Sequence, residues 1–232
     1  MRNILNVLVL IAVFIPITAK AQFTVREYEN RFSLKPYHFG ITLGYNNSNF
    51  IVTQSSDFLY NDSVYVVESS KGPGFNLGII SNLRISDHFD LRFIPSLSFS
   101  EKDLNYTLFD ATEPVQVIES IYFDFPVDLK FKSDSYKDMK VYVIGGIKYA
   151  YDLQSNAKAR NAEELVKIDA HDLAVNYGFG FEFYFPYFIF CPEIKLSNGF
   201  LELHSPDENL IYSRVINKLF SRTLLVSINL EG

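Results

Sequence analysis

The sequence predicts an all-β fold, an eight-stranded antiparallel up-and-down transmembrane β-barrel with short periplasmic turns and long external loops. Three observations predict it. Apolar and aromatic side chains recur at every second residue in eight segments, which is the period of a β-strand with one apolar face. The opposite faces hold glycines, small polar residues and charges of both signs. The connections alternate between long and short, as in outer-membrane barrels.

The first four segments share an apolar face of phenylalanine, leucine, isoleucine and tyrosine. Their other face is made of asparagine, glycine, serine and charged residues. This division indicates strands that separate an apolar medium from a polar one. The four segments are residues 37–46 (YHFGITLGYN), 74–84 (GFNLGIISNLR), 89–100 (FDLRFIPSLSFS) and 122–132 (YFDFPVDLKFK).

The last four segments follow the same rule, and the alternation is clearest at residues 176–185, where every odd position is aromatic. The segment at 140–151 is the least regular. Pro186 and Tyr187 interrupt the aromatic run and predict a tight turn. The four segments are residues 140–151 (KVYVIGGIKYAY), 176–185 (NYGFGFEFYF), 188–197 (FIFCPEIKLS) and 222–231 (RTLLVSINLE).

The contents of the two faces favour lipid on the outside. Glycines and paired charges suit a narrow lumen, whereas so many glycines on a water-facing surface would only weaken a sheet. Nine to eleven tilted residues cover roughly 25 Å, the height of the apolar band of such barrels. Tyrosines near strand ends are expected to form aromatic girdles: Tyr37, Tyr45, Tyr122, Tyr149, Tyr151 and Tyr187.

The N-terminus has the three parts of a secretory signal peptide. Arg2 precedes an apolar run from Ile4 to Ile17, and Ala19-Lys20-Ala21 forms a small-x-small cleavage site. Fourteen residues are short for a membrane-spanning helix, which needs about twenty. We therefore expect a cleaved signal peptide at residues 1–21, a short periplasmic segment at 22–36 and an outer-membrane barrel at 37–232 of a Gram-negative cell.

Composition excludes several classes of function. The formal net charge of −6 and the lack of a basic stripe argue against nucleic-acid binding. The one cysteine, Cys191, excludes a disulfide within the chain and a cysteine-based metal cluster. We expect no cofactor, and membrane lipid as the main partner.

Eight charged residues on the polar faces are predicted to form a network inside the barrel, because an unpaired charge in a narrow lumen costs several kcal/mol. Arg92 is expected to pair with Asp124, and Lys148 with Asp128 or Glu182. A structural network that holds the barrel together and a gated ion path both remain open. The eight residues are Arg92, Asp124, Asp128, Lys130, Lys148, Glu182, Glu193 and Lys195.

Other interpretations compete with this one. A barrel that binds a small ligand, either in the outer membrane or as a soluble, lipocalin-like protein, also has eight alternating strands. A surface hydrolase or acyltransferase site around His171 or His204 is a further alternative, although the sequence assigns no nucleophile to either histidine. Three prolines, Pro95, Pro126 and Pro192, lie inside predicted strands, where each removes a hydrogen-bond donor; the sequence alone does not explain them.

Four stretches resemble the PorT family of Bacteroidota across nearly the whole mature chain: GPGFNLGIISNLRISDHFDLRFIPSLSFS, IYFDFPVDLKFKS, VYVIGGIKYAYDL and VNYGFGFEFYFPYFIFCPEIKLSNG. The resemblance implies an outer-membrane barrel required for type IX protein secretion and, in gliding species, for motility. It implies no catalytic residues. Contacts with other secretion proteins are expected through residues 22–36 or through the external loops.

Overall fold

The computed structural model describes most of the chain from Tyr28 onward. It covers Tyr28, Glu29, Phe32 and residues 35–54, 64–108, 115–154, 167–205 and 216–232. The predicted signal peptide at residues 1–21 lies outside the described residues. Within the part of the chain that the structure describes, no α-helix has the length and hydropathy of a transmembrane span.

Nine strands of the described residues form one antiparallel sheet, and two very short strands pair separately at the long-loop end. The short pair is β7 (Lys167–Ile168) with β10 (His204–Ser205). The strands of the large sheet are β1 (Tyr37–Gln54), β2 (Val64–Arg84), β3 (Phe89–Phe93), β4 (Ser96–Leu108), β5 (Val115–Lys132), β6 (Met139–Asp152), β8 (His171–Tyr184), β9 (Ile189–Gly199) and β11 (Ile216–Glu231).

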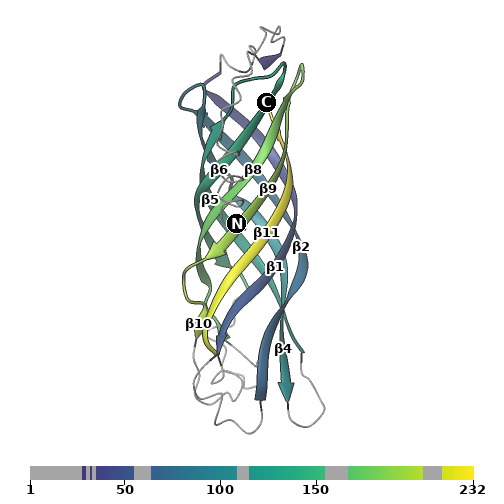
Figure 1. The fold of residues 1–232 in the computed structure, drawn as a ribbon, viewed down its shortest axis with the longest axis vertical. Coiled ribbons are helices and arrows are strands. Elements are labelled where there is room, and N and C mark those ends of the chain that lie inside the picture. The colour runs from purple at the N-terminus through teal and green to yellow at the C-terminus, as the bar shows by residue number, and fades with distance from the viewer. Residues whose placement is uncertain are drawn as a thin grey trace, which may run out of the picture.

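The large sheet closes into a barrel (Figure 1). Strands β3 and β4 follow one another in the chain and both pair with β2 on one side and β5 on the other. They therefore occupy one strand position of the barrel, and we call each such position a stave. The ring therefore has eight staves in the order β1, β11, β9, β8, β6, β5, β3/β4 and β2, and the pairing of β1 with β2 closes it. Every edge is paired, as a strand in hydrocarbon requires. The predicted eight-stranded up-and-down barrel is confirmed.

The side chains alternate between outside and lumen as the barrel prediction requires. On β1, Phe39, Ile41 and Leu43 are 50–62% exposed, while Thr42 and Asn46 between and beyond them are buried. Most other staves repeat this pattern, so that apolar side chains cover the outside of the ring. A continuous exposed apolar surface of this size needs an apolar partner. The alternative of a soluble barrel with an apolar interior is therefore wrong.

Several strands run further toward the long-loop end than the sequence predicted. β1 continues to Gln54 and β2 begins at Val64, so the predicted loop between them is largely strand. β4, β5 and β11 are extended in the same direction. The outward positions of β1 change from Tyr45 to Asn47 and Asn49. Because outward and lumen positions are both polar at residues 46–49, the period-2 contrast disappears at this point although the backbone ladder continues.

The three prolines lie at interruptions of the ladder. Pro95 falls in the break between β3 and β4, and Pro126 lies on the neighbouring stave beside the same break, where its carbonyl accepts a hydrogen bond from the amide of Ile94. Pro95 and Pro126, which both lack an N–H donor, thus lie at the same interruption of the ladder. Pro192 lies where the pairing of β8 with β9 is interrupted, while its pairing with Ile228 of β11 is kept. Each proline removes a hydrogen bond only where the ladder is already broken.

Candidate functional site

A buried ion pair crosses the lumen from one wall to the opposite wall. Arg92 of β3 donates a hydrogen bond to the carboxylate of Glu193 on β9. These two staves lie four places apart in the ring of eight, so the pair spans the barrel. The hydroxyl of Tyr142 on β6 donates to the same carboxylate at 2.8 Å. Both charged side chains are at most 1% exposed, and such a buried charge is stable only with its partner.

A second pair lies beside the first. The ammonium of Lys130 on β5 pairs with Glu182 on β8, and the hydroxyl of Tyr184 donates to Glu182 at 2.6 Å. Lys130 also lies 4.3 Å from the centre of the Tyr142 ring and 3.8 Å from the carboxylate of Glu231 on β11. Glu231 in turn lies 3.8 Å from the guanidinium of Arg92. We call Arg92, Lys130, Tyr142, Glu182, Glu193 and Glu231 the cross-barrel layer.

Toward the long-loop end, two further pairs follow. Lys195 donates to Asp128 at 2.7 Å and lies 3.4 Å from Glu193. Lys148 lies 3.8 Å from Asp124. All eight charged residues chosen from the sequence thus point into the lumen, and each has an oppositely charged partner among the described residues.

The specific pairs expected from the sequence were wrong. Arg92 pairs with Glu193 instead of Asp124, because the register sets Arg92 opposite Asp128 and leaves Asp124 opposite Ser96. Lys148 pairs with Asp124 instead of Asp128 or Glu182. Adjacency of two strands does not fix which residues face each other. The long side chain of Arg92 reaches across the ring, whereas Lys148 reaches a diagonal neighbour on the adjacent strand.

Several further residues of the lumen were not predicted from the sequence. Asp90 pairs with Lys132 at 2.6 Å and accepts a hydrogen bond from Asn82 at 3.0 Å. Asn82, Asp90 and Lys132 alternate in step with the other polar residues of their strands, and this alternation could have predicted that they point into the lumen. Tyr122, expected in an outer girdle, instead points inward and accepts a hydrogen bond from Lys102 at 2.9 Å. Tyr122 is two residues from the lumen residue Asp124 on the same strand, so alternation places both inside the barrel. Its position near a predicted strand end had instead suggested the outer girdle.

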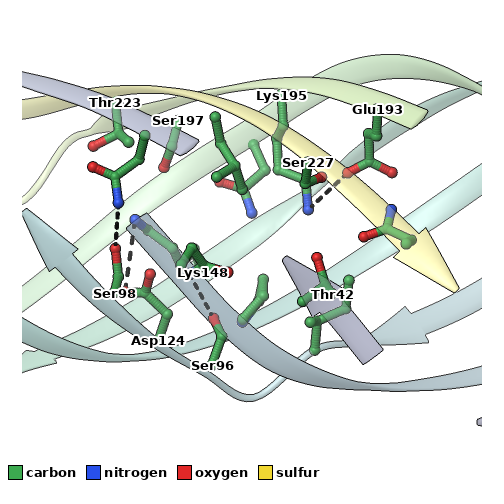
Figure 2. A pocket seen from close by; sticks show the side chains of 17 residues that line it. Thr42, Ser96, Ser98, Asp124, Lys148, Glu193, Lys195, Ser197, Thr223 and Ser227 are labelled. Atoms are coloured by element: carbon green, nitrogen blue, oxygen red, sulfur yellow. Dashed lines mark hydrogen bonds and ion pairs between the residues drawn. The ribbon is translucent and has the colours of Figure 1, made fainter. Parts of the chain in front are cut away.

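The free space between these side chains is small. Figure 2 shows the main cavity, which has a volume of about 40 Å³ and is lined by polar groups such as Asn176, Ser197 and Asn229 together with Lys148 and Lys195. Space of this size holds about three water molecules. Two cavities of about 10 Å³ lie toward either end. In the part of the chain that the structure describes, the lumen is therefore packed with side chains, as is usual for eight staves.

One glycine makes room for the cross-barrel layer. A Cβ atom on Gly180 would stand 2.5 Å from the ring of Tyr142 and 2.7 Å from the carbonyl oxygen of Pro192. We expect Gly180→Ala to lower the free energy of unfolding by about 1–3 kcal/mol, since it displaces Tyr142. Gly145→Ala is the matched control, because nothing lies within 4 Å of its Cβ position. Unfolding of both variants in urea would test this, and equal stabilities would contradict it.

The geometry gives no support to a catalytic site at the histidines. His171 lies on the outer surface, where its Nδ1 is 2.7 Å from the hydroxyl of Tyr149. The next residue, Asp172, points into the lumen and accepts a hydrogen bond from Ser221. Alternation along β8 thus puts the histidine and the acid–serine pair on opposite faces. Burial lowers the pKa of His204. Among the described residues, no group of three or more potential metal ligands is found.

A closed barrel with an apolar exterior and an ion-paired interior defines an integral outer-membrane β-barrel protein. The sequence profile of the family described as "Outer membrane protein beta-barrel domain" matches residues 20–205, and the chain belongs to this family. The protein is located in the outer membrane, as the sequence predicted. No match to the sequence is found among curated proteins.

Solved structures of outer-membrane barrels are similar to the chain. The outer membrane protein OprG from Pseudomonas aeruginosa has a TM-score of 0.50 and 8% identity, with 84% of this chain and 93% of OprG covered. Neisserial surface protein A has a TM-score of 0.43 and 10% identity, covering 84% and 96%. Ail of Yersinia pestis has a TM-score of 0.37 and 11% identity, covering 85% and 100%. At such identities the likeness to OprG concerns the fold alone.

Proposed function

We propose that this protein is an accessory outer-membrane barrel of type IX secretion, which acts through protein contacts and neither conducts solutes nor catalyses a reaction. The type IX role follows from the resemblance of its strands to the PorT family. The contact role is supported by one observation above all: Arg92 and Glu193 join opposite staves across the lumen, and the hydroxyl of Tyr142 donates a hydrogen bond to Glu193. An ion pair between opposite strands makes the barrel rigid, which suits a protein that acts through surface contacts.

The packing favours contacts over transport. The main cavity holds only a few water molecules and has charged groups of both signs that are already paired. A pore for ions or nutrients needs a continuous aqueous path, which larger barrels provide. The surfaces that remain for function are the periplasmic end and the extended strands at the long-loop end. We propose that secretion partners bind there, including at residues 22–36.

Deleting the gene in its native host tests the proposed role. We expect proteins that carry C-terminal secretion signals to accumulate in the periplasm, and in a gliding species we expect motility to be lost. Expression of the wild-type chain should restore both. The membrane fraction must contain normal amounts of the other outer-membrane proteins, so that a general assembly defect is excluded. Normal secretion in the deletion strain would refute the type IX role.

The absence of transport is tested separately. The purified protein, reconstituted into planar bilayers, is expected to give no steady ion conductance because of its packed lumen. A stable open conductance of the wild-type protein would contradict a purely contact-based function while leaving the secretion result unaffected.

A further inference from the structure

The periplasmic end of the barrel is capped by residues that precede the first strand. The backbone amides of Tyr28 and Glu29 both donate to Oδ1 of Asp138, at 2.9 and 3.2 Å. Asp138 lies in the turn between β5 and β6, at the short-turn end. The carboxylate of Glu29 forms an ion pair of 2.7 Å with Lys140 of β6, and both side chains are buried.

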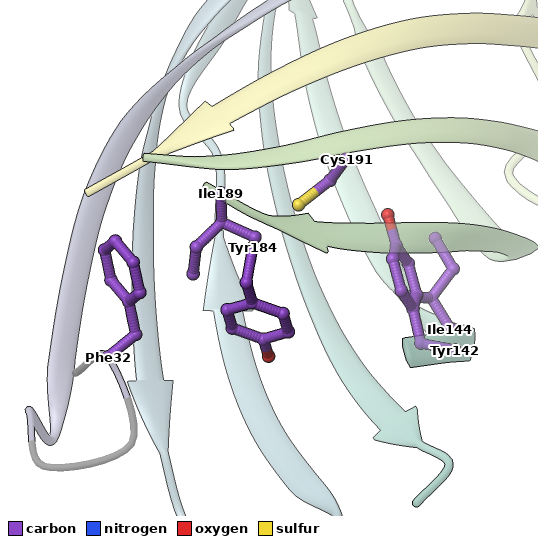
Figure 3. Packing of buried hydrophobic residues seen from close by; sticks show 6 residues of the cluster. All are labelled: Phe32, Tyr142, Ile144, Tyr184, Ile189 and Cys191. Carbon is purple, nitrogen blue, oxygen red and sulfur yellow. The ribbon is translucent and has the colours of Figure 1, made fainter. Parts of the chain in front are cut away.

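Phe32 completes this contact. Its ring is 5% exposed and packs in the mouth of the barrel against Tyr184 and Ile189, with Cys191 deeper in the same cluster (Figure 3). The ring centres of Phe32 and Tyr184 are 6.1 Å apart. The carbonyl oxygen of Phe32 lies 3.1 Å from Nε2 of His38. An aromatic side chain packed against Tyr184 and Ile189, beside a buried ion pair, can act as the anchor of a bound peptide.

Glu29 and Phe32 fit closely into the mouth of the barrel, but they are not part of its wall. The cavity behind Glu29 and Phe32 measures about 10 Å³, room for about one water molecule. Glu29 and Phe32 both have helical backbone and are three positions apart, and their side chains enter the mouth together. No residue before Tyr37 belongs to a strand of the described sheet, and the ring of staves closes without them.

We propose that the periplasmic mouth is a peptide-binding socket, that Tyr28, Glu29 and Phe32 occupy it in this structure, and that it accepts in exchange a partner segment with an acid three residues before an aromatic residue. Lys140 is buried beside Glu29, and an occupant with a neutral residue at that place would cover this ammonium without supplying the carboxylate that pairs with it, so the socket selects an acid. Tyr184 and Ile189 select the ring, and Asp138 selects free backbone amides. This inference does not depend on the type IX role.

Cys191 is a natural reporter of the state of the socket. It is the one cysteine of the chain and is fully buried, with Sγ 4.0 Å from Oε1 of Glu231 in the lumen. The full-length protein in detergent micelles is labelled with a water-soluble maleimide. We expect Glu29→Lys combined with Phe32→Ala to label faster than wild type by about tenfold or more, the factor that 1.4 kcal/mol in the opening equilibrium gives. Glu29→Gln alone should give a smaller increase.

Tyr187→Ala serves as the matched control, since it removes an exposed aromatic ring at the same end without touching the cluster. It should label at the wild-type rate. A shift in gel mobility on heating must show that each variant is folded. Equal labelling of the wild type and the double variant would overturn the proposal, because Cys191 would then be shielded by the barrel itself.

Exchange is tested by adding a synthetic peptide of residues 22–36, QFTVREYENRFSLKP, to the double variant. We expect slow labelling to return, with a saturable dependence on peptide concentration. The same peptide carrying lysine for Glu29 and alanine for Phe32 should have no effect. Rapid labelling at every concentration of the wild-type peptide would refute an exchangeable socket, even if the double variant opens the mouth.

Discussion

Arg92→Ala is expected to lower the free energy of unfolding of the barrel by about 3–5 kcal/mol, the usual cost of removing one partner from a buried ion pair. The carboxylate of Glu193 would keep its hydrogen bond from Tyr142 and its contact with Lys195. It would lose the guanidinium of Arg92, its partner from the opposite side of the barrel. Glu231, 3.8 Å from Arg92, would also lose a neighbouring positive charge. The lost interaction joins opposite staves, so no repacking within one strand replaces it.

Urea unfolding in lipid vesicles measures this loss, and the temperature at which heating changes gel mobility gives a second readout. Arg222→Ala is the matched control, since Arg222 lies on the exposed outer side of β11 and contacts Asn198. It should change stability by no more than about 0.5 kcal/mol. Similar stabilities of the Arg92 and Arg222 variants would show that the cross-barrel layer does not hold the barrel together.

A double-mutant cycle distinguishes the pair from the cost of an orphaned charge. Replacing both Arg92 and Glu193 by methionine removes both charges and keeps apolar volume in the lumen. We expect the double variant to be more stable than either single one, because neither charge is then left without its partner. A double variant whose loss equals the sum of the single losses would indicate that the two side chains act independently.

The eight charged residues predicted from the sequence do enter the lumen, but the sequence did not show which of them meet, and it misplaced Tyr122. Parity along a strand is a local property, so Asp128, Lys130 and Glu193 could be placed inside from their neighbours alone. The pairing of Arg92 with Glu193 depends on the register of the strands and on the closure of the ring, which brings two staves far apart in the chain to opposite walls. No local pattern contains that information.

The ends of the barrel were predicted less well than its middle, for two physical reasons. Beyond Tyr45, β1 leaves the apolar band, and the contrast between its faces is lost while its hydrogen bonds continue. At the other end, Glu29 and Phe32 are held by a tertiary socket rather than by a repeating pattern. Residues 22–36 lack strand periodicity, so the sequence predicts no ordered contacts for them. The contacts with Asp138 and Lys140 become apparent only in the folded barrel.

Ile41→Arg is expected to lower the free energy of unfolding in a bilayer by about 2–4 kcal/mol, the cost of an arginine on the lipid face near the midplane. Ile41 lies at the centre of the outward apolar run of β1, between Ile79 of β2 and Leu230 of β11. Its side chain is half exposed in the protein alone, so the substitution breaks few protein contacts. The penalty arises from transferring the guanidinium into hydrocarbon, which neighbouring apolar side chains cannot offset.

Thr53→Arg provides the matched control on the same strand and the same outward side. Thr53 is exposed in the extension of β1 beyond the apolar band, where the cost of arginine falls to about 0–1 kcal/mol. The comparison is made by urea unfolding from vesicles of one lipid composition, so that strand propensity and charge are shared by both variants. A difference of 2 kcal/mol or more between them, at the scale given by depth dependence, places Ile41 in the acyl chains. Equal costs would mean that the outer face of β1 at Ile41 meets water or another protein rather than lipid.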